Sequence, residues 1–164
     1  MAIKSMEELR KRFQYLGYVW PSIHIVGIRS NNQSEEFPDF VGLVEVYKIH
    51  WYRANTGLTS HWSMKFFHKK PNLVLKPGQY KNSFKMYDSV IAQSKPMTFD
   101  NGGENIFSDE SIRFIPYGDM NIFKAITCSP GSQRLKNKED YEQLSRLCKS
   151  SFKSNYTYTL LDDW

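Results

Sequence analysis

Apolar residues recur with a helical period near the start of the chain. The apolar positions are Met6, Leu9, Phe13 and Leu16. Residues three and four positions apart share one face of a helix, so this stretch predicts an amphipathic helix. Ser5 and Glu8 have the spacing of a capping box, and Gly17 suits the position that ends a helix. We therefore expect a helix over residues 6–16.

Between residues 22 and 127 the period of the pattern changes to two. Short apolar runs are separated by Pro, Gly and Asn, which is typical of strands joined by turns. The predicted strands cover residues 22–29, 40–53, 58–69, 72–75, 79–87, 106–115 and 121–127. The segments predicted to be loops, because they are rich in Asn, Ser, Gly and Pro, are 31–38 and 95–104.

The last part of the chain returns to a helical period and then to alternation. Tyr141, Leu144 and Cys148 share one helical face, and Asn137 suits the N-cap, so we expect a helix over residues 138–149. Residues 155–161 alternate and predict a last strand. The fold class is therefore α+β: one globular domain, residues 1–164, with a mainly antiparallel sheet or small open barrel of about six to eight strands. One helix near each end of the chain packs on this sheet.

The composition indicates a chain that folds without disulfide bonds or cofactors. Of the 164 residues, 40% are hydrophobic and 15% aromatic, which suffices for a core. No apolar run approaches the roughly 20 residues of a membrane-spanning helix, and no signal peptide precedes the first helix. We expect a cytoplasmic protein with no membrane contact. Cys128 and Cys148 form no C-x-x-C motif, so reduced thiols and no metal or cofactor are expected.

The positive charge is concentrated in the middle of the sequence. Residues 46–96 contain nine Lys or Arg and one acidic residue, a balance of +8, although the whole chain carries only +5. Residues 97–123 contain one basic and five acidic residues, a balance of −4. Aromatic residues are interleaved with the cations of the basic stretch. The cations could neutralise phosphates, and the rings could stack on bases. A surface that carries both would be a binding platform for single-stranded nucleic acid.

This basic surface is the main predicted binding site. Its expected residues are Lys48, Tyr52, Arg53, Ser63, Lys65, Lys69, Lys70, Lys81 and Lys85. The alternative is an ordinary solvated face, because aromatic residues in strands mostly face the core and Lys often protects edge strands.

A hairpin with a turn at residues 54–57 would bring two histidines together. If residues whose numbers sum to 111 are paired, His50 lies opposite His61 and Lys48 lies opposite Ser63. Two imidazoles among lysines could act as general base and general acid in phosphodiester cleavage without a metal. In this hypothesis Lys48 or Lys65 stabilises the developing phosphate charge. A solvated surface pair is the alternative.

Two short segments have the order of known catalytic motifs. Pro38–Asp39 followed by Glu45 and Lys48 resembles the active site of the restriction-type nuclease superfamily. In that family the second acid and the lysine are two residues apart on one strand. Here they are three apart, so in a regular strand their side chains point to opposite faces.

Residues 129–135 read Ser-Pro-Gly-Ser-Gln-Arg-Leu, which resembles the S-x-G-C-x-R segment of the L,D-transpeptidases. Residues 77–80 resemble a turn that those enzymes carry upstream. Ser132 stands where that family has its nucleophilic Cys, and Ile115 stands near the place of its His. A serine without a neighbouring base is a weak nucleophile, so the resemblance implies a catalytically inactive domain.

The first functional hypothesis is a small binding protein that contacts nucleic acid or an acidic protein surface through its basic, aromatic-rich sheet. The alternatives are a metal-independent nuclease with a His pair, a protein-interaction or inhibitor module of the phage or virus type, and an inactive L,D-transpeptidase-like domain. The sequence contains no Walker A loop, dinucleotide fingerprint or nucleophile elbow, so no nucleotide cofactor is expected.

Overall fold

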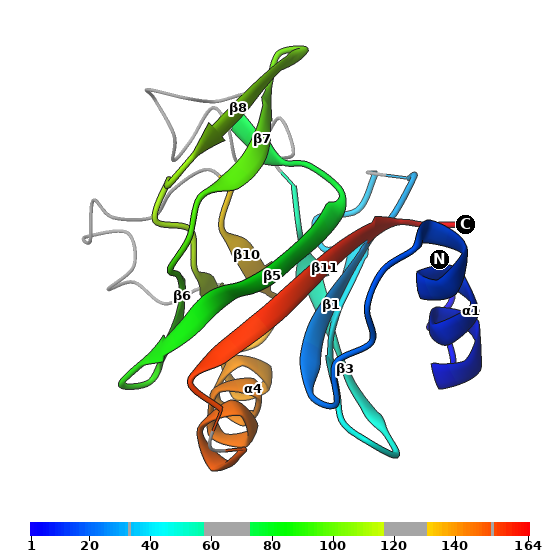
Figure 1. The fold of residues 1–164 in the computed structure, drawn as a ribbon, viewed down its shortest axis with the longest axis vertical. Coiled ribbons are helices and arrows are strands. Elements are labelled where there is room, and N and C mark those ends of the chain that lie inside the picture. The colour runs from blue at the N-terminus through cyan, green and yellow to red at the C-terminus, as the bar shows by residue number, and fades with distance from the viewer. Residues whose placement is uncertain (33, 58–72, 117–130, 152) are drawn as a thin grey trace.

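The computed structural model describes residues 1–32, 34–57, 73–116, 131–151 and 153–164 (Figure 1). The elements are α1 (Met6–Leu16), β1 (His24–Arg29), β2 (Asp39–Val44), β3 (Ile49–Asn55), β4 (Leu73–Leu75), β5 (Gly78–Tyr87), β6 (Val90–Gln93), β7 (Met97–Asn101), β8 (Glu104–Ser108), β9 (Phe114–Pro116), β10 (Gln133–Leu135), α4 (Lys138–Ser150) and β11 (Asn155–Asp162). Within these residues no helix is long and apolar enough to cross a membrane.

Eight strands form one strongly curved sheet in the order β6-β5-β11-β1-β2-β3-β10-β9. β1 and β11 pair in parallel, as do β9 and β10, and the other neighbours are antiparallel. A single bridge between Ala92 and Arg113 joins the two edge strands, β6 and β9, so the sheet is nearly closed. The prediction of an α+β fold with a mainly antiparallel, open barrel-like sheet is confirmed. A second sheet contains β4, β7 and β8.

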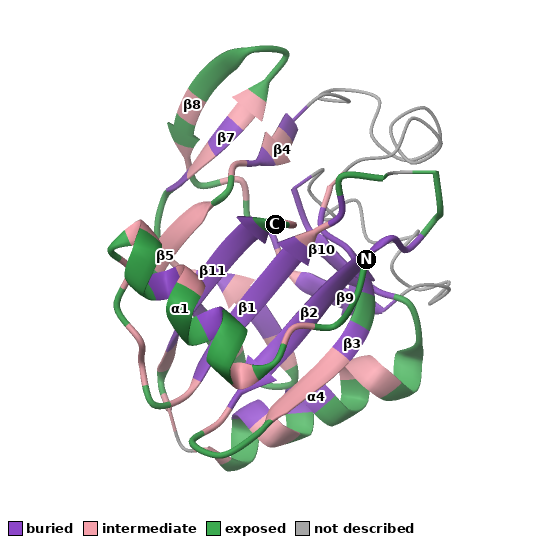
Figure 2. Ribbon diagram, turned by 90° about the vertical axis from the view of Figure 1, so that its right-hand side faces the viewer, coloured by how far each residue is buried: buried purple, intermediate pink, exposed green. Residues whose placement is uncertain are grey.

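The two helices cover different parts of the large sheet. α4 closes one end of it, with Leu144 and Cys148 buried in the main core (Figure 1). α1 lies on the outer face, where its Leu9 and Phe13 pack against the strands in a second apolar cluster. Both faces of β1 and β2 are therefore buried, as Figure 2 shows.

Local signals define both helices as expected. The Ser5 hydroxyl accepts a hydrogen bond from the backbone N–H of Glu8, and the Glu8 carboxylate accepts one from the backbone N–H of Ser5. Gly17 ends α1 in the left-handed conformation, with φ of 70°. α4 begins at Lys138 after the N-cap Asn137 and extends one residue beyond the predicted end.

Two strand predictions and one loop prediction are wrong in detail. The predicted strand 40–53 is a hairpin, because residues 45–48 form a turn that the backbone N–H of Glu45 closes on the carbonyl of Lys48. The predicted loop 95–104 contains β7 and the turn into β8, where Gly102 and Gly103 both have positive φ. The predicted strand 106–115 is interrupted between β8 and β9. The predicted strands 58–69 and 121–127 lie outside the described residues.

Candidate functional site

The described cations of the basic stretch do not form one surface. Lys48 lies in the β2–β3 turn, 3.7 Å from a carboxylate oxygen of Glu45, and Arg53 on β3 stacks over the ring of Phe40. Lys81 and Lys85 are exposed on β5. Three strands separate β3 from β5 in either direction around the nearly closed sheet. These two groups of cations therefore lie on opposite sides of it.

Of the remaining predicted binding residues, the structure describes Tyr52. The ring of Tyr52 is buried in the main core and is not available for stacking. The predicted site residues outside the described part of the chain are His61, Ser63, Lys65, Lys69 and Lys70.

His50 has an acidic neighbour that the sequence did not suggest. It lies opposite Leu43 in the β2–β3 hairpin, and its Nε2 is 3.0 Å from Oε2 of Glu45. Its pairing with His61 stays a prediction, because His61 is outside the described ranges. In the described ranges no three His, Cys, Asp or Glu side chains are grouped to hold a metal ion.

The residues that resemble a restriction-type nuclease site are far apart. Asp39 begins β2, while Glu45 follows its last residue, which separates them by roughly 20 Å at the rise of a strand. The buried Asp39 carboxylate accepts hydrogen bonds from the backbone N–H groups of Ser30 and Thr56. Asp39 therefore has a structural role at the far end of the strand.

A different group of residues comes together at the join between β6 and β9. Lys85 on β5 pairs with Ala92 on β6, and Ala92 bridges to Arg113 before β9. Paired residues in antiparallel strands point to the same face, so the three side chains form a row on the outside of the sheet. The small Ala92 side chain lies between two long cationic ones.

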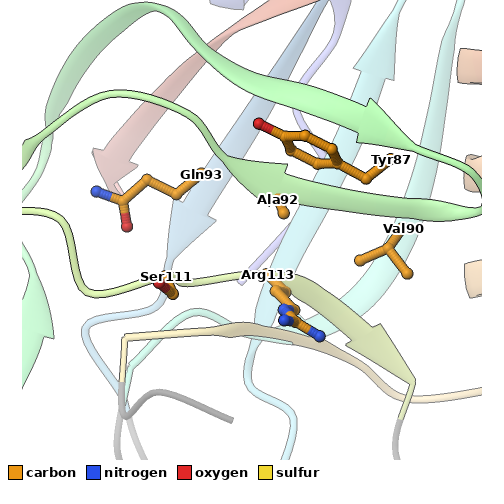
Figure 3. Close-up of a pocket in the computed structure, with 6 residues that line it drawn as sticks. All are labelled: Tyr87, Val90, Ala92, Gln93, Ser111 and Arg113. Atoms are coloured by element: carbon orange, nitrogen blue, oxygen red, sulfur yellow. The ribbon is translucent and has the colours of Figure 1, made fainter. Parts of the chain in front are cut away.

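This row borders a pocket of about 300 Å³, which we call the Arg113 groove (Figure 3). Its lining residues are Tyr87, Val90, Ala92, Gln93, Ser111 and Arg113. Figure 3 shows that they come from the ends of β5, from β6 and from the segment before β9. The groove therefore depends on contacts between segments distant in sequence.

Two sets of hydrogen bonds hold the walls of the groove. The Gln93 side chain donates from Nε2 to the carbonyl of Ser108 and accepts at Oε1 from the backbone N–H of Ile112. The hydrogen bonds of the Gln93 amide thus reinforce the short contact between the two edge strands. On the other side, the hydroxyl groups of Tyr141 and Ser145 in α4 both donate to the carbonyl of Ser89, which fixes the β5–β6 turn.

The backbone around the groove departs from ordinary conformations. Among the described residues, the non-glycine residues with positive φ are Asn82 in β5, Asp88 in the β5–β6 turn and Ser111 on the groove wall. Asn and Asp tolerate this region, but Ser111 lacks that advantage, and its backbone N–H is held by the carboxylate of Asp109. Such conformations are maintained where the surrounding structure requires them, often at binding sites.

The groove presents hydrogen-bond donors. Among the described residues, the Arg113 guanidinium and the Lys85 ammonium have no ion-pair partner. The Ser111 hydroxyl and the ring of Tyr87, which is 51% exposed, complete this face. Two cations without a described ion pair, on either side of the small Ala92 side chain, suit a carboxylate or a phosphate.

The positions that resemble the L,D-transpeptidase site lie close to Arg113. Ile115 is on β9, and Ser132 directly precedes β10, which pairs in parallel with β9 and has Arg134 opposite Ile115. The Ser132 hydroxyl is buried and accepts a 3.1 Å hydrogen bond from the backbone N–H of Arg113. The described histidines lie on β1 and β3, so no described base can activate this serine.

Comparison with family models, with curated proteins and with solved structures finds no match to this chain. The likeness to the L,D-transpeptidases therefore depends only on the quoted residues and on the pairing of β9 with β10 beside them.

Sequence reasoning missed the groove because its residues are brought together by non-local pairing. One signal was present: Arg113 is the single basic residue among the five acidic residues of segment 97–123. A lone cation in an acidic segment can be retained for a ligand, but only the bridge to Ala92 shows which other cation it joins.

Proposed function

We propose that this chain is a non-catalytic binding protein that takes an acidic side chain or terminal carboxylate of a partner protein into the Arg113 groove. The observation that carries the proposal is the row of Lys85, Ala92 and Arg113 on the outer face of the sheet. Because the Ala92 side chain is small, the two cations leave room for a carboxylate between them. Arg113 can bind it with two parallel N–H···O bonds, and Lys85 adds a second positive charge.

An acidic protein segment fits this site better than nucleic acid does. The described cations of the predicted nucleic-acid platform, Lys48 and Arg53 on one side and Lys81 and Lys85 on the other, do not line one continuous channel for a phosphate backbone. Among the described residues that line the groove, Tyr87 carries the one exposed ring, whereas single-stranded nucleic acid needs successive stacking rings. A short acidic segment needs only one anchoring pocket with a polar rim.

The test is fluorescence anisotropy with a labelled poly-glutamate peptide and, in parallel, a labelled single-stranded oligonucleotide of similar charge. We expect the peptide to bind at low ionic strength and Arg113→Gln to weaken it about 10-fold. Arg146→Gln, which removes the same charge from the exposed face of α4, is the matched control. No peptide binding, or equal affinity of wild type and Arg113→Gln, overturns the proposal. Binding of the oligonucleotide alone would favour the nucleic-acid hypothesis.

A second candidate, a catalytically inactive L,D-transpeptidase-like domain, is supported by the placement of Ile115 on β9 and of Ser132 directly before the neighbouring strand β10. If these positions descend from a Cys–His pair, Ser132→Cys with Ile115→His should give a thiol whose pKa is lowered by the imidazole. The alkylation rate as a function of pH measures this pKa, and Ser132→Cys alone is the control. The same pKa in both variants would count against this candidate.

A further inference from the structure

The hairpin of β7 and β8 carries an open strand edge. Its two-residue turn makes Asn101 and Glu104 a hydrogen-bonded pair, so hydrogen-bonded and non-hydrogen-bonded pairs alternate along the ladder. Asn105 and Phe107 fall at the non-hydrogen-bonded positions, which turns their backbone N–H and C=O groups outward. Among the described strands β8 is the last of its sheet, and these backbone groups have no partner in the part of the chain that the structure describes.

β8 lacks the features that usually protect an edge strand. Its sequence, Glu-Asn-Ile-Phe-Ser, contains no Pro and no Lys, and its only charge is Glu104 at the turn end. The ring of Phe107 is 73% exposed on the outer face of this strand. An unprotected edge beside an exposed ring favours pairing with another extended segment.

We propose that β8 pairs with β8 of a second copy of this chain, antiparallel and centred on Ile106. In this register Asn105 of each copy lies opposite Phe107 of the other, so the outward backbone groups meet as hydrogen-bonded pairs. The two Phe107 rings then lie diagonally across the new pair, within reach of each other. The two three-stranded sheets become one continuous sheet.

Several registers would bring the outward backbone groups of the two copies together, and the charges favour the one centred on Ile106. Centred on Ile106, Glu104 of each copy faces Ser108 of the other. Centring on Phe107 would instead place Glu104 opposite Glu110, two like charges across the pair. Centring on Asn105 would leave Phe107 opposite Gly103 in the turn and lose the contact between the rings.

Sedimentation analysis over a concentration series, up to about millimolar, tests the pairing, because a short edge interface gives a weak dimer. We expect the average mass to rise from 19.3 kDa toward twice that value. Phe107→Pro removes an outward N–H that the hairpin does not use, so it should keep the fold and abolish the dimer. Phe107→Thr keeps that N–H and should retain a dimer that is several-fold weaker.

Cross-linking tests the register independently. Residues 106 of the two copies are opposite each other at a non-hydrogen-bonded position, where Cβ atoms are closest. Ile106→Cys should therefore form a disulfide-linked dimer under mild oxidation, while Thr98→Cys on β7 should not. A monomer at every concentration overturns the proposal, as does Phe107→Pro that is folded by circular dichroism and still self-associates like the wild type.

Discussion

The Tyr158 hydroxyl donates a 2.6 Å hydrogen bond to Oε1 of Gln133 in the buried interior of the sheet. The amide nitrogen of Gln133 in turn donates to the carbonyl of Gly131, so the pair connects β11 to the start of β10. Burial raises the pKa of Tyr158 far above its usual value, which keeps the hydroxyl protonated as a donor.

Tyr158→Phe should destabilise the protein, because it leaves the Oε1 of Gln133 buried without its donor. An unsatisfied buried acceptor costs roughly 1–3 kcal/mol in the free energy of unfolding. Urea denaturation measures the change. Tyr15→Phe removes a hydroxyl from an exposed ring and should change stability by less than about 0.5 kcal/mol. Equal stability of the two variants would show that the buried hydrogen bond contributes nothing net.

Stability should fall at mildly acidic pH through His24. This imidazole is fully buried on β1, between the rings of Phe13 and Trp20, and neither ring nitrogen has a hydrogen-bond partner among the residues that the structure describes. Burial, with smaller effects of Lys153 and Arg10, lowers its pKa from 6.5 to about 4. Between these values the unfolded chain binds more protons than the folded one, so stability is lost as pH falls from 6.5 toward 4.

A shift of this size corresponds to about 3 kcal/mol when the pH has fallen below both values. His24→Leu removes the titrating group, so its unfolding free energy should depend less on pH than that of the wild type between pH 7 and pH 4. Urea unfolding at several pH values measures both proteins. Carboxylates titrate in the same range, but they are common to both, so parallel pH curves would contradict the assignment to His24.

The two helices could be predicted from the sequence because their signals are local. The reciprocal Ser5–Glu8 cap and the apolar spacing lie within a few residues and need no tertiary partner. The β2–β3 turn was missed for the opposite reason. Val46 and Tyr47 continue the apolar pattern of a strand, yet Tyr47 is 94% exposed at the turn. Only the pairing of β2 with β3 distinguishes this turn from the middle of a long strand.

The binding surface was harder to predict than the fold class, because neighbours in sequence were assumed to be neighbours in space. Lys48 and Lys85 belong to one basic stretch, but the strand order puts them on opposite sides of the sheet. Lys85 and Arg113 belong to segments of opposite charge and meet through Ala92. The strand order follows from the packing of the whole chain. Counting charges along the sequence does not reveal it.

Phe13→Ala should cost roughly 3–5 kcal/mol in the free energy of unfolding, because it empties the centre of the interface between α1 and the sheet. The ring is 1% exposed and contacts Trp20 edge to face, with 4.9 Å between ring centroids. Denaturant unfolding measures the loss. Phe107→Ala truncates an equally large ring on the exposed face of β8 and is the matched control. Comparable losses would mean that α1 does not depend on this contact.

Ala92→Leu should block the Arg113 groove without disturbing the core. The Ala92 side chain lies on the outer face between Lys85 and Arg113, so the larger side chain projects into the groove instead of into the packed interior. We expect affinity for the poly-glutamate peptide to fall about 10-fold while the net charge is unchanged, because the carboxylate can no longer lie between the cations. Fluorescence anisotropy measures the affinity, and urea unfolding should show a change below about 0.5 kcal/mol.

Ala92→Ser, which leaves the floor open, is the matched control. If Ala92→Leu and Ala92→Ser bind the peptide equally well, the anion does not occupy the floor of the groove, and attraction to Arg113 and Lys85 at a distance would explain any binding.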